Sequence, residues 1–186
     1  MSDAFAAGNE NMETIKIIGL VILAAVIYGI IHDQITARLC LEYFTVFHPD
    51  IFHTRSPTLL GVGWGIWATW WVGLFLGIPL ALAARAGKQF RRSARSLIKP
   101  LGAMMLTTAV FALLTGTAGY LMERNGTISL SPDWNNAVAP DHRPAFVADW
   151  FAHVTSYIVG FICGLILCIS VAVSRRNTAK RAKSGR

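Results

Sequence analysis

Four long apolar runs constrain the fold of this chain more than any other feature of its sequence. They cover residues 14–31, 57–84, 100–122 and 151–173, and the second and third contain no charged residue. Each run, the first only just, reaches the length of about 20 residues that a helix needs to cross roughly 30 Å of hydrocarbon. Because backbone polar groups in lipid must find partners within their own segment, the runs predict transmembrane helices.

A soluble four-helix bundle is the alternative for a chain that is 54% hydrophobic. It would need a polar stripe along each helix, and none of the four runs has one. A cleaved signal is disfavoured, because the residues before the first run are acidic where a signal peptide is basic. We therefore predict an all-α integral membrane protein, a single domain over residues 1–186 whose four transmembrane helices form an antiparallel bundle. The expected helices cover about residues 14–47, 57–85, 100–123 and 145–174, after a short polar tail at 1–13.

The net charge of +7 is unevenly distributed along the chain. Most Lys and Arg residues lie between the second and third runs and in the C-terminal tail, residues 175–186, whereas the other two connections hold most of the carboxylates. The positive-inside rule then places both termini and the middle connection in the cytoplasm of a multi-pass inner-membrane protein. The basic tail is expected to be a flexible anchor to anionic lipid headgroups, and nothing in the distribution indicates nucleic-acid binding.

The two outer connections differ in composition. Residues 32–44, HDQITARLCLEYF, have no Gly or Pro and space Gln34, Arg38 and Glu42 at intervals of four, which favours an Arg38–Glu42 pair on a helix. The first helix is therefore expected to continue, or to bend along the membrane surface, until Pro49 ends it near residue 47. Residues 123–149 are rich in Asn, Asp, Pro and Ser and predict an irregular loop before Pro144 starts the fourth helix.

All five histidines lie on the side away from the basic residues. Counting about 1.5 Å per residue from the cytoplasmic ends places two of them at one depth near the outer boundary, His32 on the first helix and His153 on the fourth. Each has a carboxylate nearby, Asp33 and Asp149 respectively. This shared depth makes the four residues the candidate site.

The spacing of these residues points to metal binding. Asp149 and His153 are spaced i, i+4, so they share a helix face and can bind one ion, although a dipole-favoured carboxylate beside an interfacial histidine is the simpler interpretation. Adjacent His32 and Asp33 point about 100° apart, so they cannot chelate one ion as an i, i+4 pair does, and one could bind an ion while the other pairs with Arg38 or caps a neighbour. The predicted metal ligands are His32, Asp33, Asp149 and His153, a set that suits Zn, Fe or Mn.

Further candidate additions to this metal site are Glu42, His48, Asp50 and His53. A turn through Pro49 and Asp50 would bring the two imidazoles together, although exposed loop histidines are the simpler interpretation. Haem suits the sequence less than a bare metal ion, because His32 and His153 are the only pair at matching depth and lie at the water boundary.

Small and aromatic residues bear on assembly. The pairs Gly61/Gly65, Gly73/Gly77, Gly160/Gly164 and Ala112/Gly116 have four-residue spacing. Such faces let helices approach closely, within the bundle, against a second copy or against a membrane protein partner. Trp64 fits the membrane interface, and the deeper Trp67 and Trp71 are expected to pack inside the bundle.

Two functional hypotheses follow. The first is a membrane-embedded metal site, catalytic or redox, with a histidine or carboxylate acting on a lipid-soluble or periplasmic substrate. The second is a non-enzymatic accessory or assembly subunit of a larger membrane complex, with Arg38–Glu42 and Arg143–Asp149 pairs at its helix ends. The sequence has no nucleotide-binding loop or zinc-protease motif, and the lack of a charge pair midway through any run argues against an ion-coupled transporter.

Overall fold

The computed structural model of this protein describes residues 2–87 and 90–184. This part of the chain is 83% helical and contains no strand. The stretches long and apolar enough to cross a membrane are Asn11–Leu39, Pro57–Arg85, Ala94–Arg124 and Arg143–Ser184. The predicted all-α class with four candidate transmembrane helices is therefore confirmed.

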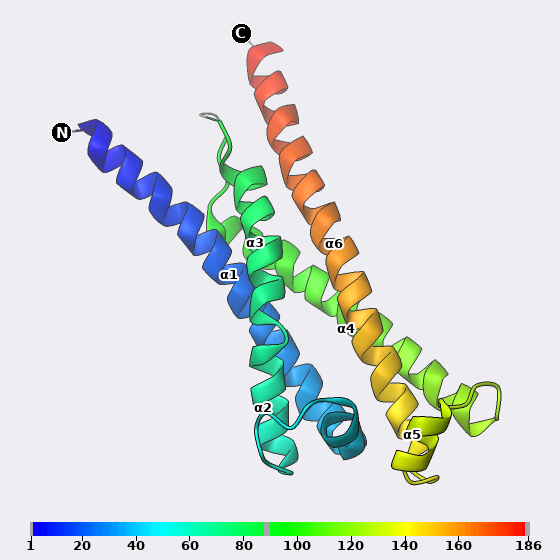
Figure 1. The fold of residues 1–186 in the computed structure, drawn as a ribbon. Coiled ribbons are helices and arrows are strands. Elements are labelled where there is room, and N and C mark those ends of the chain that lie inside the picture. The colour runs from blue at the N-terminus through cyan, green and yellow to red at the C-terminus, as the bar shows by residue number, and fades with distance from the viewer. Residues whose placement is uncertain (1, 88–89, 185–186) are drawn as a thin grey trace.

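The helical elements lie between two distinct ends of the molecule (Figure 1). In chain order they are α1 (Ser2–Leu39), the π-helical turn η1 (Tyr43–Phe47), α2 (Pro57–Trp67), α3 (Trp70–Arg85), α4 (Ala94–Arg124), α5 (Pro132–Ala137) and α6 (Arg143–Ser184). The first turns of α1 and the last turns of α6 lie at one end, together with the α3–α4 connection, and we call it the basic end. We call the opposite end, which carries η1 and α5, the η1 end.

The first helix differs from its predicted bounds of 14–47 at both ends. It begins at Ser2, so the predicted polar tail is helical, and it ends at Leu39. The helical path breaks at Cys40 and resumes as η1. The break turns Tyr43 and Phe44 inward, where they keep only 3% and 2% of their surface exposed. Burial of these two rings is the physical reason why the helix does not run on to residue 47.

The other helices also depart from the predicted bounds. The second run is interrupted at Ala68–Thr69, where the Thr69 hydroxyl donates to the carbonyl oxygen of Gly65 at 2.5 Å instead of leaving that oxygen to a helical N–H. α4 begins at Ala94 rather than at residue 100, and a carboxylate oxygen of Glu13 on α1 accepts a hydrogen bond from its first N–H at 3.2 Å. α6 continues to Ser184, so the tail expected to be flexible is helical over most of its length.

Packing joins α1 to α2 and α3, and α4 to α6, while contacts of α3 with α6 and of α1 with α4 connect these two groups. A Cβ atom added at Gly65 would lie 2.5 Å from the backbone nitrogen of Ile30, and one at Gly73 would lie 2.6 Å from the Cα of Ile22. The paired small residues therefore contact helices of the same chain. Docking of a partner through such faces stays a prediction.

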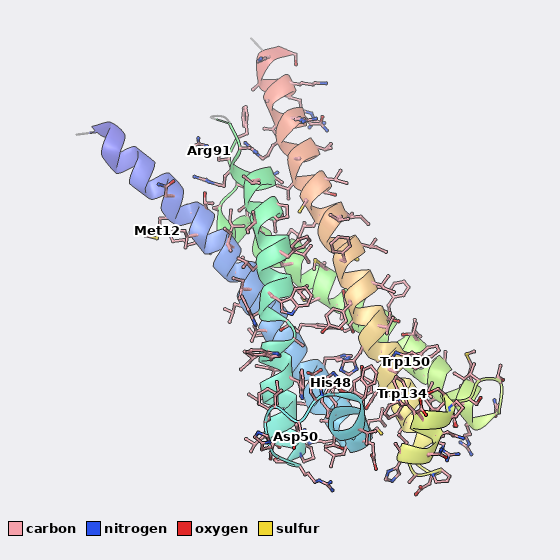
Figure 2. All side chains as sticks on the ribbon, viewed as in Figure 1. Met12, His48, Asp50, Arg91, Trp134 and Trp150 are labelled. Carbon is pink, nitrogen blue, oxygen red and sulfur yellow. The ribbon has the colours of Figure 1, made fainter. Side chains whose placement is uncertain are left out.

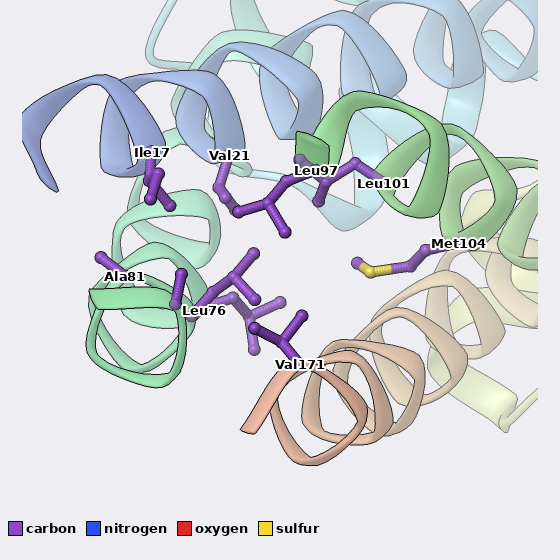
Figure 3. Packing of buried hydrophobic residues seen from close by; sticks show 10 residues of the cluster. Ile17, Val21, Leu76, Ala81, Leu97, Leu101, Met104 and Val171 are labelled. Atoms are coloured by element: carbon purple, nitrogen blue, oxygen red, sulfur yellow. The ribbon is translucent and has the colours of Figure 1, made fainter. Parts of the chain in front are cut away.

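Two apolar clusters hold the helices together. Figure 3 shows the one nearer the basic end, which contains Ile17, Val21, Leu76, Ala81, Leu97, Leu101, Met104 and Val171. The other lies near the η1 end and contains Tyr43, Phe44, Trp64, Val138 and Phe146 among its buried residues. In each candidate span, only 17–28% of the most apolar window is buried inside the protein, which fits helices whose remaining surface faces lipid.

Candidate metal centre

Three of the predicted ligands meet between α1 and α6. Each of His32, Asp33 and His153 offers one ligand atom, and these three atoms all lie within 4.8 Å of one another. Nε2 of His153 lies 3.2 Å from Oδ1 of Asp33. The side chains of Asp33 and His153 keep 7% and 12% of their surface exposed, so the group is largely shielded from solvent. We call these three residues the metal trio.

The orientation of His153 is set by its own helix. Its Nδ1 lies 2.7 Å from the backbone carbonyl oxygen of Asp149, one turn earlier in α6. A carbonyl oxygen can only accept, so Nδ1 carries the proton and donates it. In the neutral imidazole, Nε2 then has a free lone pair, and that lone pair is directed at the carboxylate of Asp33. A backbone carbonyl that fixes the tautomer in this way is typical of metal-bound histidines.

His32 brings a second imidazole to the same point. Its Nε2 is buried and has no hydrogen-bond partner. Its ring meets the ring of His153 edge to face, with 4.5 Å between the ring centroids. That separation leaves no room for a porphyrin between the two imidazoles, which weighs against haem.

Although adjacent residues of a helix point about 100° apart, His32 and Asp33 each offer a ligand atom to the same cluster. The expected partners are also different. Arg38 donates to the side-chain oxygen of Gln34 at 2.7 Å and to the hydroxyl of Thr58 at 2.8 Å, so it pairs neither with Asp33 nor with Glu42. These bonds tie Arg38 to its own helix and to α2, which releases Asp33 for the trio.

Asp149 is not brought into the group as a side-chain ligand. Its side chain is fully buried, and neither carboxylate oxygen has a hydrogen-bond partner. Arg143, its expected partner, donates instead to the backbone carbonyl oxygens of Val138 and Asn135. Asp149 therefore serves the trio through its main chain, by holding His153, while its side chain lies apart.

The additional candidates also lie outside the trio. Glu42 lies 2.6 Å from Nδ1 of His142, and its other oxygen accepts from the thiol of Cys40 at 3.4 Å. Burial raises the pKa of the Cys40 thiol to about 12. Asp50 and His53 face each other at 3.6 Å on the exposed loop.

His48 lies in the aromatic wall beside the trio. Its Nδ1 lies 2.9 Å from the carbonyl oxygen of Tyr43, and its ring stacks on Phe44 with centroids 5.7 Å apart. Burial lowers the pKa of His48, which favours its neutral form. His48 and His53 are not brought together at an ion.

Several residues that lie beside the trio were not predicted from the sequence as part of the site. The ring of Tyr43 lies 4.5 Å from that of His153, centroid to centroid, and Phe44 lies at 5.8 Å. Tyr28 shares a hydrogen bond of 2.8 Å with Ser156, which links α1 to α6 one turn deeper. The aromatic residues close in sequence at 43, 44 and 47 were the available signal for this wall.

The tryptophans are placed differently from their predicted positions. Trp64 is buried, with 7% of its surface exposed, and its ring lies 4.5 Å from that of His48. Trp67 and Trp71, expected inside the bundle, are 60% and 51% exposed and face the surroundings of the helices. The parts of α2 and α3 that lie against the α1 backbone carry glycines instead, at Gly65 and Gly73.

No family model, curated protein or solved structure matches this chain. Its function is therefore inferred from its own side chains.

Proposed function

We propose that this chain is a multi-pass membrane protein that binds one divalent metal ion through His32, Asp33 and His153 and uses it for catalysis. The basic end lies in the cytoplasm of an inner-membrane protein and the η1 end faces the periplasm, as the positive-inside rule favours. The metal centre then lies just below the outer boundary of the membrane. Ionisable residues at such depth are costly and tend to mark functional sites.

One observation carries the proposal, which is the approach of two acceptor atoms. Nε2 of His153 and Oδ1 of Asp33 lie 3.2 Å apart, and both are acceptors in the neutral imidazole, whose single proton is donated to the carbonyl oxygen of Asp149. Two lone pairs repel each other unless a cation or an added proton lies between them. A ring nitrogen of His32 completes a three-sided set of ligand atoms around the same point, and a metal ion satisfies all three atoms together.

The separation of these atoms fits a metal ion. Zinc binds imidazole nitrogen and carboxylate oxygen at about 2.0–2.2 Å, so two ligand atoms of a tetrahedral site lie roughly 3.3 Å apart. His153 and Asp33 already have that separation. His32 needs only a small rotation to reach it, because its ligand atom lies within 4.8 Å of the other two.

Three protein ligands leave at least one position of the metal open, which is the arrangement of catalytic rather than structural zinc sites. A metal ion there supplies a Lewis acid and a bound water of lowered pKa. Two histidines and one carboxylate also suit Fe and Mn, so the ligand set fits hydrolytic and redox chemistry alike. His32, Asp33 and His153 would hold the ion, the carbonyl oxygen of Asp149 orients the ring of His153, and the wall formed by Tyr43, Phe44 and His48 shields the site from water.

The test is metal analysis of the detergent-purified chain, followed by zinc titration of metal-stripped protein. We expect one ion per chain, and a loss of roughly tenfold or more in zinc affinity in His32→Ala, Asp33→Asn and His153→Ala. His53→Ala is the matched control, because it removes an exposed histidine at the η1 end and should keep wild-type affinity. A metal-free wild type that binds no added zinc, or wild-type affinity in the His32 and His153 variants, would overturn the metal centre.

A further inference from the structure

A cavity of about 280 Å³ leads from the metal trio into the membrane-spanning part of the molecule. Its lining on α1 extends from Asp33 to Val21, and its lining on α6 extends from Trp150 to Phe161. Twelve residues of helix rise about 18 Å, so the cavity is far longer than the trio alone would need. A long, narrow space of this kind suits a chain-like molecule.

The deep part of the cavity is apolar. Val21, Val72, Leu76 and Met104 line it where α1, α3 and α4 approach one another. The volume lies at the lower limit of ligand pockets, which measure roughly 300–1,000 Å³. A volume of this size suits a ligand with one hydrocarbon chain rather than two.

The side of the cavity opens between helices. Trp150, Tyr157 and Phe161 of α6 line the cavity and keep 37–42% of their surface exposed. Figure 2 shows Trp150 on α6 near the η1 end, and His48, which follows η1, lines the same cavity. In a membrane, the exposed faces of these aromatic rings contact lipid, so a bilayer molecule reaches the cavity without passing through water.

The end of the cavity nearest the η1 end of the molecule has buried polar atoms that lack hydrogen-bond partners. Trp64 and His32 both line it, and the indole Nε1 of Trp64 and the Nε2 of His32 are both buried without a hydrogen-bond partner. An indole N–H can only donate, so it calls for an oxygen acceptor on a bound molecule. The polar end of the ligand therefore carries oxygen and lies beside the metal trio.

The charges at this end favour a neutral head over a phosphate. Among the described residues that line the cavity there is no Lys or Arg, which are the usual phosphate-binding side chains. A divalent ion beside Asp33 leaves at most one net positive charge, whereas a phosphate monoester carries about −1.5 to −2. Burying the excess negative charge among apolar side chains is unfavourable.

We propose that this cavity binds a neutral single-chain lipid, such as a long-chain alcohol, aldehyde or ester, with its oxygen at the metal trio and its chain directed toward Leu76. Any reaction at that oxygen rests on the proposed metal centre. Binding of the hydrocarbon chain does not rest on the metal centre, because the apolar lining of the cavity lies farther from the η1 end than the trio.

The experiment uses a hexadecanol analogue that carries a photoreactive diazirine in its chain and an alkyne for detection. The full-length protein in detergent is irradiated with this probe, and the labelled peptides are mapped by mass spectrometry. We expect saturable labelling of Thr69–Leu76 and Val154–Phe161. Hexadecanol should compete at concentrations roughly tenfold lower than hexadecyl phosphate or hexadecane. Equal competition by the phosphate, or labelling that hexadecanol does not suppress, overturns the proposal.

A pair of glycine variants tests the position of the chain. Gly160 lines the cavity, and a Cβ atom there meets nothing closer than Thr108 at 3.9 Å, so Gly160→Phe fills the space without a backbone clash. It should reduce saturable labelling roughly tenfold. Gly19→Phe is the control, because Gly19 has nothing within 4 Å and lies outside the cavity. Equal labelling of both variants, each with wild-type thermal unfolding, contradicts the proposed position.

Labelling is measured on zinc-loaded and on metal-stripped protein, which separates the two proposals. Saturable labelling of a protein that binds no metal would uphold the lipid site and overturn the metal centre. Stoichiometric zinc binding without saturable labelling would uphold the metal centre and overturn the lipid site. The competition experiment on the unsubstituted protein tests the lipid site even if Gly160→Phe does not fold.

Discussion

His142, just before α6, forms a 2.6 Å contact through Nδ1 with Oε1 of Glu42, just before η1. The hydrogen bond to Glu42 raises the pKa of His142, with help from Asp141. Burial works to raise the pKa of Glu42, but the hydrogen bond from His142 and further bonds at the carboxylate lower it overall. The contact therefore favours the charged form of both partners and links the two elements that flank the metal trio.

This link predicts a pH dependence of stability. A histidine with a raised pKa stabilises the fold below its ordinary value of 6.5 and loses that effect as the pH rises through the raised value. A glutamate with a lowered pKa stabilises above 4.5 and loses its effect as the pH falls. The contribution of the pair to the unfolding midpoint should therefore be largest between about pH 5 and 6.5 and should decline toward pH 8.

Thermal unfolding in detergent across this pH range measures the effect. His142→Ala and Glu42→Gln should both flatten the decline above pH 6.5, by a small amount because the two side chains are 51% and 27% exposed. His53→Ala should leave the decline unchanged. An undiminished decline in His142→Ala would show that another group causes it.

The close approach of α1 and α2 predicts the effect of a single methyl group. A Cβ atom at Gly65 would lie 2.5 Å from the backbone nitrogen of Ile30 and 2.8 Å from the carbonyl carbon of Gly29. Because backbone atoms cannot give way locally, Gly65→Ala should move α1 and lower the free energy of unfolding by about 1–3 kcal/mol. Zinc affinity should fall too, since α1 carries two of the trio residues.

Gly19→Ala is the matched control for that substitution. Gly19 has nothing within 4 Å, so alanine there should be neutral or stabilising by up to about 1 kcal/mol through helix propensity. The comparison requires unfolding curves and zinc titrations of both variants. Similar behaviour of the two would mean that α1 and α2 are not held at this distance.

For a substitution of Asp149 we expect a more stable fold that still binds zinc. Its two carboxylate oxygens are buried without partners, and leucine has nearly the same branched shape without the polar atoms. Asp149→Leu should therefore raise the free energy of unfolding by about 1 kcal/mol or more. The backbone carbonyl that holds His153 stays in place, so zinc affinity should change less than in Asp33→Asn. A loss of zinc binding as large as that of Asp33→Asn would show that the side chain of Asp149 is itself a metal ligand.

The meeting of His32 with His153 could be predicted from the sequence, whereas the set of side chains that gather there could be predicted only in part. Counting helical rise from the apolar runs placed His32 and His153 at one level, and the two rings do meet. Spacing alone could not decide between the side chain and the backbone of Asp149, because both lie one turn before His153. The backbone carbonyl forms the contact.

Tertiary contacts account for the features that local pattern did not reveal. The residues from 32 to 44 have the composition of a continuous helix, yet the path breaks at Cys40 because Tyr43 and Phe44 are buried by packing against distant segments. At the start of the helical tail after Val173, Arg92 donates to the hydroxyl of Ser174 at 2.8 Å, which is also a long-range contact. Neither partner is visible from the neighbouring sequence.

Zinc itself should stabilise the fold in a way that reports on the trio. A ligand that binds only the folded state contributes about 2.7 kcal/mol at a concentration one hundred times its dissociation constant. The ion would join α1 to α6 at a place where those helices make few other contacts, so the unfolding midpoint should rise with zinc concentration. His32→Ala and His153→Ala should abolish this rise, whereas Asp149→Leu should retain it. A rise of equal size in all these variants would assign the stabilisation to zinc bound elsewhere on the chain.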